Sequence, residues 1–283
     1  MKTNFLFFTV LPGALGLLLS WLYPGISLTG FILPALILVL IPHFIDLHYA
    51  VIRDTLRNIK PILLIAVVGF LLAPLWTYLI SHSLLEGTPT YVIVGFTLFA
   101  ITPGNVLAPI FTQMRQGDTK LPVLFYAVSY LFALVLVPVW SQLLLGRLIP
   151  IPVAVIVRAF LLVIGVPLLI TRILRFTVLR RATEEQKERF KGYLQKIGPC
   201  GLAFIFFSIF AERGELLLTH PTLVLKVLPA AALLLLACLV SGLLLSRLWG
   251  LPLATTEAVM ITAATKNTCL FVVTSGIGVV AMP

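Results

Sequence analysis

The stretch that decides the fold runs from Phe99 to Pro109 and reads Phe-Ala-Ile-Thr-Pro-Gly-Asn-Val-Leu-Ala-Pro. It lies inside a long apolar segment, residues 90–114. A proline removes a backbone donor and clashes with the carbonyl four residues back, and Gly104 beside Pro103 lets the chain leave helical geometry. Asn105 can then cap a second, shorter helix. The stretch predicts a membrane helix that is broken near its middle, with a simple proline kink as the alternative.

The chain around this stretch is too apolar for a water-soluble protein. Of its 283 residues, 60% are hydrophobic and 11% are charged. Soluble domains have about half apolar and about a quarter charged residues. Intrinsic disorder needs low hydrophobicity and high charge, so it is excluded as well. We therefore expect a protein whose partner is the lipid bilayer.

The apolar residues gather in long runs. A helix that crosses a bilayer needs about 20 mostly apolar residues. Nine such stretches lie at residues 4–22, 28–47, 60–81, 90–114, 120–146, 150–171, 197–211, 222–246 and 253–282. Because backbone polar groups cannot stay unpaired in hydrocarbon, these runs must be helices. The predicted fold class is an all-α membrane protein, a polytopic helical bundle of about nine spans.

The basic residues predict how the bundle is oriented. With the N-terminus inside, fifteen of the twenty Lys and Arg residues lie in inside segments and three in outside segments. Cytoplasmic loops carry such an excess of Lys and Arg. We expect a plasma (inner) membrane protein with a cytoplasmic N-terminus and a C-terminus on the outer side. The net charge of +10 is then a topology signal, and no nucleic-acid partner is expected.

One long polar connection divides the chain. Residues 175–196 hold many charged side chains, and we expect a cytoplasmic linker there, with a short surface helix joining the two halves. It is either simply solvated or in contact with anionic lipid headgroups. Residues 1–174 then form the first five spans plus the sixth, and residues 197–283 form the last three.

The patterns of soluble enzymes are absent from the sequence. The four histidines do not form an HExxH motif, the three cysteines lack the spacing of a metal site, and there is no P-loop. No nucleophile and base can be paired. We expect no enzymatic activity, no catalytic residue, no cofactor and no bound metal.

The last predicted span contains a lysine, Lys266, whose charge is energetically unfavourable inside the bilayer. Lys266 lies thirteen residues after Leu253, which places it about 20 Å deep at a rise of 1.5 Å per residue. An ammonium group at the centre of a bilayer costs about 2.5–3.5 kcal/mol. We expect a compensating partner, which is the carbonyl end of a half-helix finishing near Thr265, an anionic substrate, or Glu257.

Further polar residues of the last span are candidates for the same site. Asn267 and Thr268 can cap a second half-helix, and Thr262 is a candidate ion ligand. Glu257 either couples an ion or simply favours the helix dipole. Cys269 is a candidate soft ligand, or plain packing. Two interrupted spans, one in each half of the chain, are typical of a transporter binding site. The predicted substrate- or ion-binding residues are Pro103, Gly104, Asn105, Thr262, Lys266, Asn267 and Thr268.

At these residues the chain resembles the sodium/bile acid symporter superfamily, which includes an arsenite-efflux branch. The similar positions are Pro103-Gly104, Gly117-Asp118 and Pro138, then Lys60-Pro61 with Phe70 and Pro74, and for the arsenite branch Arg213-Gly214-Glu215 through Leu251 and Glu257–Asn267. The resemblance implies two five-helix inverted repeats, a panel domain and a core domain, with the fourth and ninth spans unwound where they cross. It also implies a tenth span that this chain does not contain, either because the member lacks it or because the sequence is truncated.

The chain departs from the family at the sodium ligands. In the bile acid branch, a glutamine of the third span aligns with Gly69, and a glutamine of the ninth span aligns with Lys266. Most sodium ligands are therefore replaced, and Lys266 places a fixed cation where the resemblance implies a sodium ion. The fourth-span cysteine of the arsenite branch aligns with Gly104.

The sequence thus predicts a secondary transporter that moves a small organic anion by alternating access, coupled to Na+ or H+. Its site lies where the fourth and ninth spans cross. An efflux permease for arsenite or another metalloid oxyacid is one alternative. A non-transporting membrane subunit or sensor on the same scaffold is another. The substrate, the direction of transport and the oligomeric state are left open.

Overall fold

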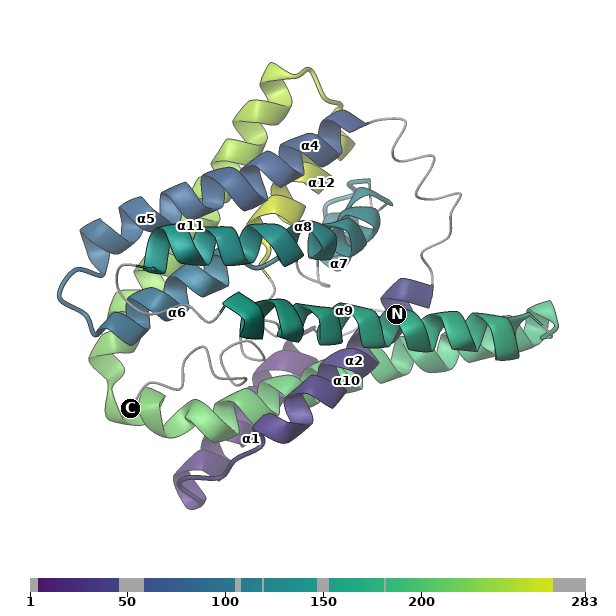
Figure 1. Cartoon of the computed structure of the whole chain (residues 1–283), viewed down its shortest axis with the longest axis horizontal. Coiled ribbons are helices and arrows are strands. Elements are labelled where there is room, and N and C mark those ends of the chain that lie inside the picture. The colour runs from purple at the N-terminus through teal and green to yellow at the C-terminus, as the bar shows by residue number, and fades with distance from the viewer. Residues whose placement is uncertain are drawn as a thin grey trace. The chain divides into compact units, whose positions relative to one another are not determined.

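The computed structural model describes residues 5–45, 59–104, 108–118, 120–146, 153–180 and 182–266. Within these ranges the regular elements are all helices and none is a strand (Figure 1). They are α1 (Phe5–Leu22), α2 (Thr29–Ile45), α4 (Ile59–Val67), the π-helix η1 (Val68–Leu72), α5 (Ala73–Leu84), α6 (Thr90–Ile101), α7 (Ala108–Met114), α8 (Lys120–Leu145), α9 (Val153–Leu174), the π-helix η2 (Arg175–Leu179), α10 (Glu184–Thr219), α11 (Pro221–Leu248) and α12 (Leu253–Ala264). The all-helical prediction is confirmed.

Several of these helices can cross a membrane. Among the described residues, four segments are long and apolar enough, namely Ile59–Leu84, Leu161–Leu179, Glu185–Thr219 and Pro221–Leu248. The two parts of α8, bent by 60°, make a fifth if they count as one span. Shorter apolar helices of 10 to 17 residues occupy four further predicted stretches. A multi-pass helical membrane protein is therefore confirmed, while nine complete spans stay a prediction.

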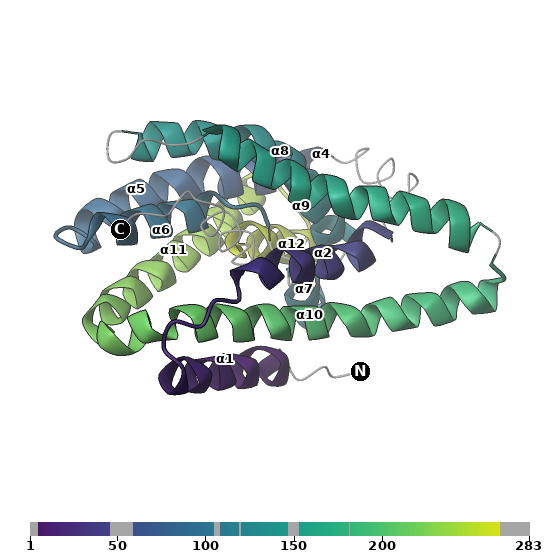
Figure 2. The same cartoon turned by 60° about the horizontal axis from the view of Figure 1, so that its bottom comes forward.

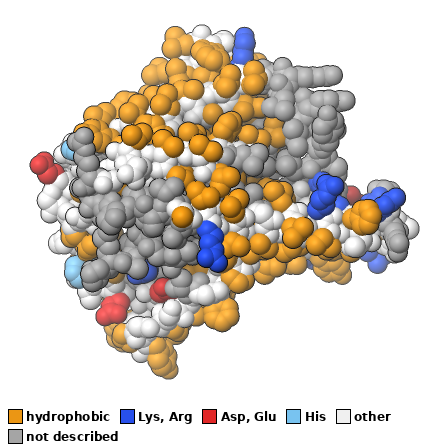
Figure 3. All heavy atoms as spheres, in the orientation of Figure 1, with side chains coloured by type: hydrophobic (Ala, Val, Ile, Leu, Met, Phe, Trp, Pro, Cys, Tyr) orange, Lys and Arg blue, Asp and Glu red, His pale blue; other side chains and the backbone are white. Residues whose placement is uncertain are grey.

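The described surface suits lipid. Large apolar side chains are exposed along many helices, with Leu248 at 79% and Leu253 at 76%. Soluble proteins rarely expose such extensive apolar patches. Figure 3 shows hydrophobic side chains spread over much of the described surface, whereas Lys and Arg side chains gather at the end where α9 passes into α10. Apolar helix flanks and charged helix ends are what a bilayer requires.

The first of two compact units comprises Met1–Asp46 and Ala159–Pro221. In it α1 and α2 both pack against α10, and Figure 2 shows α1 lying alongside α10. Gly16 lets α1 approach closely, because a Cβ at this position would lie 2.4 Å from the carbonyl oxygen of Phe207. This unit contains neither of the two helix breaks.

The predicted short linker helix differs from the structure. Thr183 and Gln186 form a capping box that starts α10, since each side chain satisfies a backbone donor of the other. From there α10 runs for 36 residues to Thr219 and includes Pro199. The polar segment is therefore helical, but it is continuous with the seventh predicted span. The division of the chain at residues 175–196 stays a prediction.

The second unit comprises Leu47–Arg158 and Thr222–Pro283. Here α12 packs against α4, η1, α7 and α8, and α6 packs against α5 and α8. The indole Nε1 of Trp76 donates to Ser241 Oγ at 3.1 Å and ties α5 to α11. Phe125 and Tyr130 of α8 are almost completely buried. Both helix breaks lie in this unit.

Candidate functional site

The first break separates α6 from α7. Helix α6 ends at Ile101, because Thr102 takes an extended conformation with φ −66° and ψ 153°. The Thr102 hydroxyl donates to the Phe99 carbonyl at 2.6 Å, which satisfies one acceptor at the helix end. Helix α7 begins at Ala108. The helix thus breaks where Pro103 and Gly104 predict it, while Asn105 lies outside the described residues.

The second break ends α12. The helix finishes at Ala264, and Thr265 is extended, with φ −79° and ψ 123°. The Thr265 hydroxyl donates to the Ile261 carbonyl at 2.9 Å. The half-helix expected to finish near Thr265 is therefore present. Asn267, Thr268 and Cys269 lie outside the described residues, so their predicted roles stay predictions.

The two breaks meet in space. Gly104 and Lys266 form an isolated antiparallel β-bridge, so the extended chain after α6 pairs with the extended chain after α12. A Cβ at Gly104 would lie 3.7 Å from the Phe125 ring and 3.9 Å from Ser129 Oγ, so the bridge is backed by α8. The carbonyl ends of two helices converge here, and each carries a partial negative charge.

The Lys266 side chain reaches from this crossing to the third predicted span, which contains Gly69. Its side chain is 6% exposed, and it is the one buried charged side chain among the residues that the structure describes. The Nζ atom donates to the Gly69 carbonyl oxygen of η1 at 2.6 Å. The resemblance aligned Lys266 and Gly69 with two sodium ligands of the family. The structure joins these two positions by a hydrogen bond.

The π-helix explains why the Gly69 carbonyl can accept this bond. In an α-helix it would accept from the N–H of Ala73, but that N–H donates to the Val68 carbonyl instead. In a continued π-helix it would accept from residue 74, which is a proline without an N–H. No backbone N–H of its own helix therefore donates to the Gly69 carbonyl, and the carbonyl accepts a hydrogen bond from the Lys266 ammonium group instead.

Two other predicted site residues are separated from this contact. Thr262 is 2% exposed, and its hydroxyl donates to the Ala258 carbonyl of its own helix at 2.6 Å. Its only proton is thereby used, so it can act toward an ion only as an acceptor. Glu257 does not pair with Lys266 and lies toward the other end of α12.

Glu257 forms an ion pair with Arg115, which follows α7. The distance from Arg115 Nη2 to Glu257 Oε1 is 2.9 Å, and Arg115 Nε donates to Oε2 at 3.4 Å. The hydrogen bond to Glu257 and then the charge of that carboxylate raise the pKa of Arg115, so the guanidinium stays charged. Helix α12 begins at Leu253. Glu257 is therefore in the second turn and not at the dipole position of the first.

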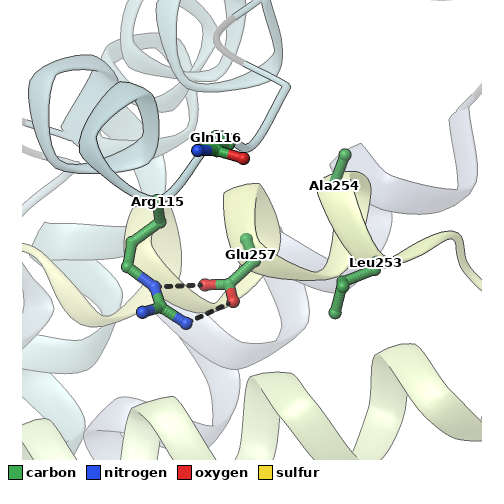
Figure 4. A pocket seen from close by; sticks show the side chains of 5 residues that line it. All are labelled: Arg115, Gln116, Leu253, Ala254 and Glu257. Carbon is green, nitrogen blue, oxygen red and sulfur yellow. Dashed lines mark hydrogen bonds and ion pairs between the residues drawn. The ribbon is translucent and has the colours of Figure 1, made fainter.

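The ion pair lines a shallow hollow of about 500 Å³. Figure 4 shows the two charged side chains facing each other across it, with Leu253 and Ala254 at the start of α12. Beside the hollow, the Asp118 N–H donates to the Ala254 carbonyl at 3.0 Å and joins the chain after α7 to the first turn of α12. This hollow and the Lys266 contact lie at opposite ends of α12.

Three neighbours of the predicted site were missed from the sequence. Gly69 contributes its backbone carbonyl and has no functional side chain that would draw attention to it. Arg115 was counted only among the basic residues that orient the protein in the membrane. Cys238 of α11 is 1% exposed and interacts electrostatically with Lys266, but its position in an apolar run gave no sign of this. Pro74 signals a disturbed hydrogen-bond pattern in this span, but only the π-helix of the structure shows that the Gly69 carbonyl is the one without a backbone donor. No group of three or more His, Cys, Asp or Glu side chains suited to a metal occurs in the described ranges.

Comparison with known proteins agrees with this architecture. The model of the sodium bile acid symporter family matches residues 33–220, which include the first break and end before α12. An uncharacterized transporter of Synechocystis sp. is 24% identical over 235 residues, which cover 75% of this chain and 60% of that protein. The chain thus spans less than two thirds of the length of this relative. Since the family match covers more than half of its residues, the chain belongs to the sodium bile acid symporter family.

Proposed function

We propose that this protein is a secondary transporter that carries a small organic anion across the membrane by alternating access. Membership of a symporter family and similarity to a transporter support transport. The observation that carries the proposal is the buried Lys266 ammonium at the crossing of two helix breaks. A charged group at such a place marks a substrate or ion pathway in membrane proteins. We propose no enzymatic role.

The charges at the crossing favour an anion as substrate. The C-terminal ends of α6 and α12 meet there, and each is equivalent to about −0.5 elementary charge. Without a cation nearby, the partial negative charges of these two helix ends would repel an anion. The positive charge of Lys266 offsets them, so a carboxylate or a similar group can approach the carbonyl-rich crossing.

The two compact units suggest how access could alternate. We propose that the unit with both breaks is the core domain and the unit built from α1, α2, α10 and most of α9 is the panel. The nine predicted spans would belong to inverted five-helix repeats, with α6–α7 and α12 as corresponding elements. Motion of the core against the panel would expose the crossing to either side of the membrane.

The proposal includes a membrane orientation and a source of energy for transport. The N-terminus is cytoplasmic and the C-terminus faces the outside of the plasma (inner) membrane, with Arg115 and the charged ends of α9 and α10 on the cytoplasmic side. Transport is coupled to an ion gradient of Na+ or H+. Single-cysteine labelling at an exposed position such as Glu86 or Gln116 from either side of intact cells tests this orientation, since the two must react from opposite sides.

Uptake by proteoliposomes tests the function. The purified chain would be reconstituted and offered radiolabelled bile salts, 2-oxo acids and arsenite, with empty liposomes as the control. Saturable uptake of at least one organic anion is expected. Uptake of arsenite alone would replace the proposal by metalloid efflux. The absence of any uptake by correctly folded, reconstituted protein would contradict transport and favour a membrane subunit or sensor.

A further inference from the structure

We infer that the Lys266 ammonium is the built-in occupant of a cation site, so that this transporter carries its anion without sodium. The inference rests on the proposed function for the anion and narrows its ion coupling. It follows from what surrounds the Nζ atom and from how the chain presents it.

The surroundings of Lys266 are those of a monovalent cation site. Two helices, α6 and α12, end close to the place where the backbones of Gly104 and Lys266 pair, so the partial negative charges of both C-terminal ends lie near the crossing. The π-helix η1 adds the Gly69 carbonyl from a third element. Unwound backbone carbonyls and helix C-termini are the groups with which transporters of this kind hold a coupling cation.

The ammonium group already occupies this place. Its Nζ lies 2.6 Å from the Gly69 oxygen, a short charge-assisted hydrogen bond. The β-bridge to Gly104 fixes the backbone of Lys266, so the side chain is held at both ends. A Cβ at Gly69 would lie 3.8 Å from Nζ. A side chain larger than alanine at position 69 would therefore compete with the ammonium group for space, and a sodium ion bound to the same carbonyl would meet a like charge at close range.

The chemistry of a tethered cation differs from that of a dissolved one. A sodium ion binds and leaves in every transport cycle, and its gradient can drive the anion uphill. The Lys266 ammonium offsets the same helix ends but stays attached to the chain. The anion is then transported with no stoichiometric sodium, and the driving force comes from protons or from the gradients of the anions themselves.

A substrate-free experiment tests the cation site. The thermal unfolding of the purified full chain would be measured in choline chloride, sodium chloride and methylammonium chloride at equal ionic strength. The Tm of the unchanged protein is expected to be the same in the three salts. Lys266→Ala should lower the Tm and make it rise by about 2–4 °C in methylammonium or sodium, because a ligand that binds only the folded state stabilises it.

Two further variants keep this test decisive. Lys266→Gln preserves much of the side-chain length and supplies a neutral carbonyl oxygen, so it should show the same new response to sodium if Lys266→Ala does not fold. Lys226→Ala removes an exposed lysine of α11 and should leave all three salts equivalent. A Tm of the unchanged protein that rises with sodium would overturn the inference, as would Lys266 variants that fold but respond to neither cation.

Transport gives the second readout and separates this inference from the proposed function. Anion uptake in choline and in sodium media should agree within about twofold, whereas a stimulation by sodium of about tenfold or more would overturn the inference and leave the transporter proposal intact. If no anion is transported, the proposed function fails, and the salt dependence of the Tm still decides whether Lys266 fills a cation site.

Discussion

Two charged side chains nine residues apart differ in their surroundings: Glu257 lies on α12, and Lys266 lies just after the end of this helix. Glu257 pairs with Arg115 at the surface, with side chains that are 17% and 67% exposed. Lys266 is 6% exposed and donates to the neutral carbonyl of Gly69. The two side chains are held in different places, because Glu257 lies in the second turn of α12 and Lys266 lies beyond its C-terminal end.

The difference shows that burial sets what each contact is worth. An exposed ion pair contributes about 0–1 kcal/mol, because water and salt screen it. A buried ammonium has lost its hydration, so removing its compensation costs much more. The Arg115–Glu257 ion pair, although it has two formal charges, should therefore contribute little. The hydrogen bond from Lys266 to the Gly69 carbonyl should contribute much more. Four predictions test this ranking.

Replacing the buried lysine should have the largest effect. In Lys266→Met the helix ends at the crossing lose their compensating charge, so anion uptake should fall by about 100-fold or more, which corresponds to about 2.7 kcal/mol. Proteoliposome uptake measures the loss, and the amount of membrane-inserted protein should be unchanged. The control is Lys226→Met on the exposed face of α11. Uptake that survives in Lys266→Met would remove the lysine from the mechanism.

Filling the space at Gly69 should come second. In Gly69→Leu the atoms beyond Cβ enter the room of the Nζ atom, which lies 3.8 Å from the Cβ position. Such overpacking costs about 1–3 kcal/mol, and uptake should fall by about tenfold. Gly69→Ala adds only an ordinary contact and should keep most of the activity. The control is Gly165→Leu, since a Cβ at Gly165 meets nothing within 4 Å. Equal effects of leucine at both positions would contradict the proposed packing.

A smaller effect is expected where the chain after α7 meets α12. A Cβ at Gly117 would lie 2.7 Å from Thr112 Cγ2 and 3.1 Å from the Ala254 carbonyl oxygen. Gly117→Ala should therefore lower the unfolding free energy by about 1–3 kcal/mol, seen as a lower Tm. Gly192→Ala is the control, because its Cβ meets no atom within 4 Å. If both variants keep the Tm, this contact is looser than described.

The exposed ion pair should matter least. Arg115→Gln and Glu257→Gln should each change the unfolding free energy by no more than about 1 kcal/mol. Combining the two in a double-mutant cycle gives the coupling energy, which should shrink as salt is added. The Arg189–Glu185 pair, at 2.8 Å with both side chains exposed, is the fully exposed reference. A coupling energy well above that of the reference would reverse the ranking of the two ends of α12.

The break in the fourth span could be predicted from residues alone. Pro103 and Gly104 act on the backbone of their own segment, so their effect does not depend on distant contacts. A half-helix that finishes near Thr265 was expected on other grounds, as one candidate that could compensate the buried charge of Lys266. The partner of Lys266 was not predicted, because the Gly69 carbonyl is a backbone group and carries no signature in the amino-acid types. Glu257, one of three candidate partners of Lys266, pairs with Arg115 from another part of the chain instead.

The sequence by itself determined that the chain is a helical membrane protein with one buried lysine and a broken fourth span. These properties follow from hydrophobicity, charge and local backbone chemistry, which act over a few residues. Only the tertiary structure decided that Gly104 pairs with Lys266 and that the ammonium rests on η1. Such contacts join residues up to 197 positions apart. They depend on how helices pack in three dimensions, where a freed carbonyl and a buried charge satisfy each other.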